Sequence, residues 1–202
     1  GWSFIKKAGT IILLSTIFVW FTSRFGWLDG QFCMLEEEQI SASILAKIGN
    51  AIAWIFAPLG WGNWQATVAS ITGLVAKENI VGTLGVLYSG GAGTVYDAIA
   101  AAFNGITGYS FLVFNLLCAP CFAAIGAIKR EMNSPKWTWF AIGYQCGFAY
   151  AVALMINQFG GLFTGNANII GVIAAVIVLA AIIYMLVRPY KEATKLTTKV
   201  EM

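Results

Sequence analysis

The sequence has no histidine and very little charge. Of its 202 residues, 10% are charged and 59% are apolar, and the mean hydropathy is +0.77. A soluble domain carries roughly 25% charged residues, so this composition cannot cover a water-facing surface. The lack of histidine excludes His-based acid–base catalysis and histidine metal ligation within the chain. We therefore expect an integral membrane protein, which is neither a soluble enzyme nor a nucleic-acid-binding protein.

Cysteines and nucleotide-binding signatures are also scarce. The sequence contains no G-x-x-x-x-G-K-[ST] phosphate-binding loop, so we assign no nucleotide hydrolysis to this chain. Few cysteines, placed mostly inside apolar segments, do not form the framework of a secreted disulfide-rich protein. The four are Cys33, Cys118, Cys121 and Cys146.

Four apolar segments are long enough to cross a bilayer core of about 30 Å, which takes roughly 20 residues. They cover residues 8–28, 109–128, 137–157 and 169–187. Between the first two lie two apolar pieces, residues 44–56 and 64–88, separated by a Pro- and Gly-containing stretch. The predicted fold class is all-α: a polytopic membrane helical bundle of about four full spans plus a broken or re-entrant helix pair.

The charged residues predict the orientation of these spans. Acidic residues Asp29 and Glu36–Glu38 fall outside, because the positive-inside rule places the basic clusters in the cytoplasm. This orientation is consistent along the chain only if residues 40–88 enter and leave the membrane on the same, outer side. We expect a membrane unit over residues 1–190 and a cytoplasmic tail over 191–202. The basic clusters are Lys6/Lys7, Lys129/Arg130/Lys136 and Arg188/Lys191/Lys195/Lys199.

One candidate site is a charged pair inside the second apolar piece. Lys77 and Glu78 follow Gly73 within this segment, and burying either charge alone costs at least a few kcal/mol. Interrupted helices at membrane depth commonly build transporter sites. The two charges therefore line a transport pathway or gate, or alternatively lie near an interface and extend to the headgroups.

A second candidate lies within residues 109–128, where Asn115 is followed by Cys118, Pro120 and Cys121. Pro120 removes one backbone hydrogen bond and frees a carbonyl near Leu116. On a continuous helix the two sulfurs would share a face and, with that carbonyl, offer ligands to a divalent metal such as Fe²⁺. The alternative is that the thiols pack as small hydrophobic groups and the proline only kinks the helix.

Three ordered motifs resemble the second Gate region of the bacterial ferrous iron transport protein B family. They are P-L-G-W-G-N-W from Pro58, T-G-L-V-A-K-E from Thr72 and G-T-L-G-V-L-Y from Gly82. The A-P-C stretch at 119–121 and the basic turn that follows also resemble that family. The resemblance covers essentially the whole chain, and it implies the C-terminal permease half of an Fe²⁺ transporter in the bacterial inner membrane, not an enzyme.

The resemblance also implies a substrate, partners and functional residues. Fe²⁺ is the transported substrate, while GTP and Mg²⁺ belong to an upstream domain absent from these residues. The implied partners are the N-terminal half with its first Gate half and GTP-binding domain, membrane lipid, small cytosolic accessory proteins and a homo-oligomer. Cys121 matches the family's cysteine proposed to line the iron path. Cys118 and Glu78 are secondary metal-ligand candidates that come from the residues themselves and not from the resemblance. The other pathway or gate residues are Lys77, Pro120, Gly73 and Asn115.

Two alternatives to iron transport stay open, and the second of them belongs to a different functional class. A related Gate-type protein would transport nucleosides or another small solute, and a membrane scaffold would have no pathway of its own. An iron path predicts that thiols and carboxylates converge inside the bundle. A nucleoside site predicts aromatic stacking with amide donors, and a scaffold predicts that Lys77, Glu78 and Cys121 face headgroups or dry packing.

Overall fold

The computed structural model describes residues 2–28, 31–35, 37–75, 77, 79–88, 94–165 and 168–188. Most of them are helical, which confirms the predicted fold class. The helices are α1 (Trp2–Arg24), α2 (Ile44–Phe56), α3 (Trp64–Val75), α4 (Asn79–Leu87), α5 (Val95–Ala102), α6 (Gly105–Leu117), α7 (Phe122–Met132), α8 (Pro135–Thr164) and α9 (Ile169–Val187), with short 3₁₀ helices η1 (Glu37–Ala42) and η2 (Ala57–Leu59).

A small β-hairpin, which the sequence analysis did not predict, follows α1. Strands β1 (Phe25–Leu28) and β2 (Gln31–Met34) pair antiparallel, with Phe25 opposite Met34. The first helix therefore ends at Arg24, before the predicted end at residue 28. Aromatic rings favour this ending, because Phe25 stacks on Phe32 across the pair with ring centroids 5.7 Å apart.

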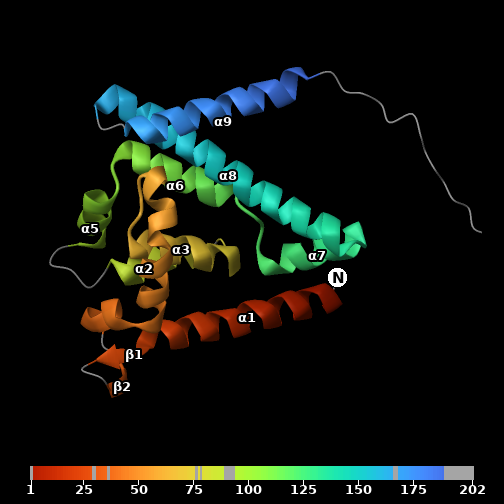
Figure 1. The fold of residues 1–202 in the computed structure, drawn as a ribbon. Helices are drawn as coiled ribbons and strands as arrows, with labels where there is room; N and C mark the ends of the chain where they lie inside the picture. Colours follow the sequence, from red (N-terminus) through yellow and green to blue (C-terminus); the bar gives the residue numbers. More distant parts are fainter. Residues whose placement is uncertain are drawn as a thin grey trace, which may run out of the picture.

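The helices form three groups in space (Figure 1). Helix α1 runs along one side, the packed pair α8 and α9 runs along the opposite side, and α2 to α7 lie between them. The buried core lies where η2, α3, α6 and α8 meet. Its centre is Trp61, which stacks on Phe56 at 4.6 Å between centroids and meets Phe111 edge-on at 5.1 Å.

Among the residues that the structure describes, two helices, α8 and α9, are long and apolar enough to cross a membrane, and up to four spans result if each bent pair counts as one. The bent pairs are Ile44–Leu59 with Trp64–Gly73, at 93°, and Val95–Ala102 with Gly105–Leu117, at 94°. Large apolar side chains such as Leu186, 80% exposed, cover the outside of α9. A surface of this kind fits contact with lipid.

The predicted interruption after residue 56 is confirmed, and a second one follows it. Helix α2 ends at Phe56, and Gly60 turns the chain with a φ of +91°. The apolar piece 64–88 forms two helices, α3 and α4, which run antiparallel. Tyr88 Oη lies 3.3 Å from Asn63 Oδ1, and the Thr72 and Thr83 hydroxyls lie 3.3 Å apart. The hairpin therefore returns to the end of the molecule where it began, as a re-entrant segment must.

The prediction of one continuous span over residues 109–128 is wrong. Helix α6 ends at Leu117, residues 118–121 are not helical, and α7 begins at Phe122. The cause is Pro120, which has no N–H to donate and disfavours helical backbone in the residue before it. The proline therefore divides the span where the sequence analysis expected only a freed carbonyl.

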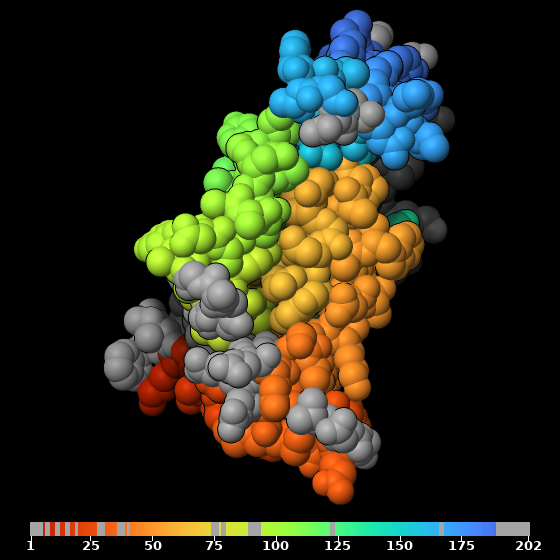
Figure 2. Space-filling model, turned by 90° about the vertical axis from the view of Figure 1, so that its left-hand side faces the viewer, coloured from red at the N-terminus to blue at the C-terminus, as the bar shows by residue number. Residues whose placement is uncertain are grey.

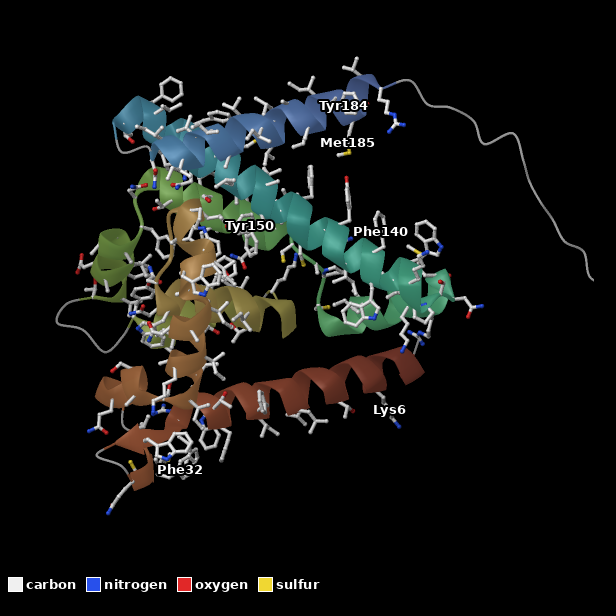
Figure 3. All side chains as sticks on the ribbon, viewed as in Figure 1. Lys6, Phe32, Phe140, Tyr150, Tyr184 and Met185 are labelled. Carbon is white, nitrogen blue, oxygen red and sulfur yellow. The ribbon has the colours of Figure 1, made fainter. Side chains whose placement is uncertain are left out.

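The described members of the three predicted basic clusters gather at one end of the bundle. Figure 1 shows the start of α1, the α7–α8 turn and the end of α9 at this end, which carries Lys6, Lys129, Arg130, Lys136 and Arg188. In Figure 3, Lys6 lies at this end and Phe32 at the opposite end of α1. Figure 2 views the opposite end, where α2 in orange lies beside the α5–α6 segment in green. The tail over residues 191–202 lies outside the described residues.

Candidate functional site: a junction of two helix interruptions

Lys77 connects the interruption between α3 and α4 to the interruption between α6 and α7. It lies in the turn between α3 and α4, and its Nζ donates to the carbonyl oxygens of Leu116 at 3.1 Å and Cys118 at 3.3 Å. In a continuous helix the Leu116 carbonyl would accept from the N–H of residue 120, which is Pro120 and has none. The freed carbonyl that the sequence predicts near Leu116 is therefore present, and it accepts a hydrogen bond from the Lys77 ammonium.

The electrostatics of this contact favour a cation. The last carbonyls of a helix carry the negative end of its dipole, which stabilises positive charge there. Leu116 and Cys118 provide these carbonyls at the end of α6, and they converge on one Nζ. The junction is thus a cation-binding arrangement of backbone oxygens, filled in this structure by the side chain of Lys77.

The thiols at the junction are not arranged as the sequence predicts. Cys118 and Cys121 do not share a helical face, because residues 118–121 are not helical. Cys118 Sγ instead lies 3.6 Å from Cys146 Sγ, in the middle of α8. Cys121 precedes the first turn of α7, where its half-buried side chain makes no capping hydrogen bond. Pro120 between them is also half-buried.

Asn115 and Gly73 hold the junction together. The Asn115 amide donates to the Ser70 hydroxyl at 3.2 Å and to the Phe111 carbonyl at 2.8 Å, so it ties α6 to α3. Gly73 lets α3 and α4 approach closely, because a Cβ there would lie 2.6 Å from Ile80 Cδ1. The structure gives both residues a positioning role. Glu78 lies outside the described residues.

A second polar region surrounds the bend after α2. A cavity of about 710 Å³ opens there, between η2, α6, α8 and α9. The Pro58 carbonyl accepts from Asn157 Nδ2 at 3.1 Å and from Gln158 Nε2 at 2.7 Å, and Tyr150 Oη donates to the Ile55 carbonyl at 2.7 Å. Sequence reasoning did not select these side chains, because nothing local shows that α8 lies against this bend.

Neither region contains a cluster of metal-ligating side chains among the residues that the structure describes. Within those residues, no group of three or more Cys, Asp and Glu side chains comes together to hold a metal ion. The ligands that the junction offers are backbone oxygens and thiols. This arrangement suits transient contact with a cation, because a tight metal site takes four or more fixed ligands.

Comparison with known proteins identifies the family. Residues 5–135 match the model of the Gate family, which is described as nucleoside recognition. The chain belongs to the Gate family. Both helix interruptions of the junction lie inside the matched Gate region, whereas Cys146 and the amides of the α2 bend lie beyond it.

The relatives of this Gate chain are named as iron transporters. It is 39% identical over 163 residues to the Fe(2+) transporter FeoB of Methanocaldococcus jannaschii, which covers 80% of this chain and 24% of that protein. The FeoB of Staphylococcus aureus strain COL is 33% identical over 160 residues, which covers 79% of this chain and 23% of the relative. The FeoB of Campylobacter jejuni is 35% identical over 162 residues, or 75% and 26%.

These matches confirm the resemblance to ferrous iron transport protein B. The chain spans about a quarter of the length of these relatives. No solved structure shows a significant match to it.

Proposed function

We propose that this chain forms part of the membrane pathway of a ferrous iron transporter, and that Fe²⁺ passes the junction between Lys77 and the end of α6. The proposal rests on one observation: the Lys77 ammonium donates to two backbone carbonyl oxygens at the end of α6, next to Pro120. The names of the relatives, Fe(2+) transporter, support iron as the cargo.

Lys77 acts in this proposal as a tethered cation that competes with the transported one. When its side chain withdraws, the carbonyl oxygens of Leu116 and Cys118 become available to Fe²⁺, with thiol sulfur close by. Fe²⁺ accepts both oxygen and sulfur ligands, and conduction needs sites that bind it weakly enough to release it. Cys121 and Glu78 are proposed as further ligands along the same path.

The wider organisation belongs to the same proposal. The basic end of the bundle would face the cytoplasm of a bacterial inner membrane. GTP and Mg²⁺ would act in an upstream domain, and a first Gate half would complete the pathway. A relative from Porphyromonas gingivalis is named as a fusion of Fe(2+) transport protein A with Fe(2+) transporter FeoB. That name supports a small accessory protein as a partner.

Nucleoside transport is the second candidate, because the family description is nucleoside recognition. The cavity at the α2 bend has aromatic and amide side chains in its wall. The amide nitrogens of Asn157 and Gln158, however, already donate to Pro58, and the Tyr150 hydroxyl donates to Ile55. One donor of each amide and the tyrosine hydroxyl are therefore engaged by the bend itself. The contact of two thiols beside a cation-binding helix end favours iron.

The proposal predicts that Lys77→Met lowers the KM for Fe²⁺, by about tenfold for a competing interaction worth 1.4 kcal/mol. Methionine keeps the length of the side chain but removes the competing ammonium, whereas Lys77→Arg keeps a cation and serves as the matched control. Initial rates of radiolabelled Fe²⁺ uptake would be measured in cells that lack other ferrous transporters and express the full-length protein.

The uptake must be normalised to the amount of protein in the membrane. An unchanged KM in Lys77→Met at equal abundance would contradict the proposed competition. Uptake of radiolabelled uridine, with no uptake of Fe²⁺, would favour the nucleoside alternative.

A further inference from the structure

The contact between Cys118 and Cys146 links two parts of the bundle. Cys118 follows the last residue of α6, Cys146 lies in the middle of α8, and their sulfurs are 3.6 Å apart. Both residues are free thiols. Cys118 is only 8% exposed, and Cys146 is half-buried. The pair therefore connects the interrupted end of α6 to the helix against which α6 packs.

The separation of the sulfurs suits formation of a covalent bond. A disulfide is 2.03–2.05 Å long, so the two sulfurs need to approach by about a further 1.5 Å, within the range of small side-chain rotations. The chain also supplies internal comparisons. Cys33 lies in β2, at the far end of α1, and Cys121 lies three residues after Cys118 in the same interruption.

A positive charge lies beside the pair. The Lys77 ammonium is 3.3 Å from the carbonyl oxygen of Cys118 itself. The same charge opposes the entry of a second cation between the two sulfurs, so it favours thiol–disulfide chemistry over a fixed metal site at this pair.

We propose that Cys118 and Cys146 form a peroxide-responsive dithiol. The thiolate of Cys146, the more exposed of the two, attacks one oxygen of hydrogen peroxide. The O–O bond breaks, hydroxide leaves and takes up a proton as water, and Cys146 becomes a sulfenic acid. The thiolate of Cys118 then attacks the Cys146 sulfur, the S–O bond breaks, and a second water leaves. The two thiols lose two electrons and two protons, and peroxide is reduced to two waters.

The disulfide would fix the end of α6 against α8. The carbonyls of Leu116 and Cys118, which Lys77 holds, would then be tied to α8 through the Cys118 backbone. Oxidation would therefore restrict the movement that exposes these oxygens. This consequence for transport rests on the proposed function, whereas formation of the disulfide does not.

Peptide mapping of the purified full-length protein tests the disulfide directly. The protein would be treated with hydrogen peroxide, its remaining thiols blocked with N-ethylmaleimide, and the chain cleaved with trypsin without reduction. Trypsin cuts after Lys129, Arg130 and Lys136, so Cys118 and Cys146 fall in separate peptides. We expect a linked pair of peptides that dithiothreitol separates.

Single substitutions assign the link to its residues. Cys118→Ser and Cys146→Ser should each abolish it, and Cys121→Ser, in the same peptide as Cys118, should leave it intact. A link that survives in Cys118→Ser but not in Cys121→Ser would overturn the proposal. Free, alkylated Cys146 after peroxide treatment that oxidises the exposed methionines would also overturn it.

Uptake measurements test the consequence separately. Peroxide should lower Fe²⁺ uptake several-fold in the unsubstituted protein and in Cys33→Ser, and dithiothreitol should restore it. Uptake by Cys146→Ser should not respond, and Cys146→Ala, compared at equal membrane abundance, guards against a folding defect. A disulfide that forms without any change in Fe²⁺ uptake would overturn the regulatory consequence. Absence of Fe²⁺ uptake before peroxide is added would count against the proposed function instead.

Discussion

Cys121 lies where the chain leaves the interruption and enters α7, and its thiol makes no capping hydrogen bond. A serine there keeps the size of the side chain and an oxygen ligand but loses the polarisable sulfur. Alanine loses all ligand capacity. If the thiol is a transient Fe²⁺ ligand, both variants lower uptake, and Cys121→Ala lowers it more, by about tenfold or more.

The measurement for Cys121 is Fe²⁺ uptake per unit of membrane protein. Packing alone predicts the opposite order of the two variants, because serine adds a polar group to a half-buried position and alanine does not. Wild-type uptake in Cys121→Ala at equal abundance would end the ligand hypothesis.

For single residues, the sequence predicts effects within one turn of the chain, but it does not predict which distant side chains come into contact. The freed carbonyl at Leu116 follows from Pro120 alone, because the missing N–H lies four residues along the same chain. The partner of Cys118 is Cys146, which depends on how α6 and α8 pack. No spacing within the sequence specifies that register. The prediction that Cys118 and Cys121 share a face failed because it assumed a helix that the proline prevents.

The bend after α2 depends on the conformation of one residue, Gly60. Its φ of +91° disfavours any residue with a Cβ, and a Cβ there would also collide with Asn157 Oδ1. We expect Gly60→Ala to destabilise the fold by at least about 1–3 kcal/mol through backbone strain alone. The thermal unfolding midpoint of the detergent-solubilised protein would fall, and less protein would reach the membrane.

Gly82→Ala and Gly85→Ala are matched controls for this variant. Both glycines lie in α4, where a Cβ meets nothing within 4 Å, and alanine favours helix over glycine by roughly 0.5–1 kcal/mol. The controls should therefore leave the midpoint unchanged or raise it. A Gly60→Ala protein as stable as these controls would show that the bend does not need the left-handed conformation.

The sequence predicts the bounds of a helix where an apolar segment of helical length is followed directly by turn residues. The piece 44–56 has the bounds of α2, since a Pro- and Gly-containing stretch follows it. Hydropathy failed where it stays high through a break, as at residues 118–121, because apolar side chains continue on both sides. It also gave no sign of the β-hairpin after Arg24, whose strands are too short for a clear alternating pattern.

For the whole molecule, charge predicted an arrangement that hydropathy could not. The described members of the three basic clusters gather at one end of the bundle, although they are far apart in the sequence (Figure 1). The hairpin α3–α4 is compatible with this arrangement, because it returns to its starting end. The side of the membrane on which this end lies stays a prediction.

Cysteine labelling of intact cells tests that orientation. We expect a membrane-impermeant maleimide to label Glu37→Cys from outside and to label Lys195→Cys only after the cells are opened. Cys33 would be replaced by serine in both variants to remove its background signal. Labelling of position 195 in intact cells would defeat the scheme.

Helix α8 is longer than the hydrocarbon core of a bilayer is thick. Its 30 residues rise about 45 Å at 1.5 Å per residue, against a hydrocarbon core of about 30 Å, whereas the 19 residues of α9 rise about 28 Å. A helix longer than the hydrocarbon core tilts or extends into the headgroups, and its tilt responds to the thickness of the bilayer. Along this one helix, Cys146 contacts Cys118 at the end of α6, and Tyr150 and Gln158 donate to the α2 bend. We therefore expect the acyl-chain length of the surrounding lipid to act on the junction and on the α2 bend together.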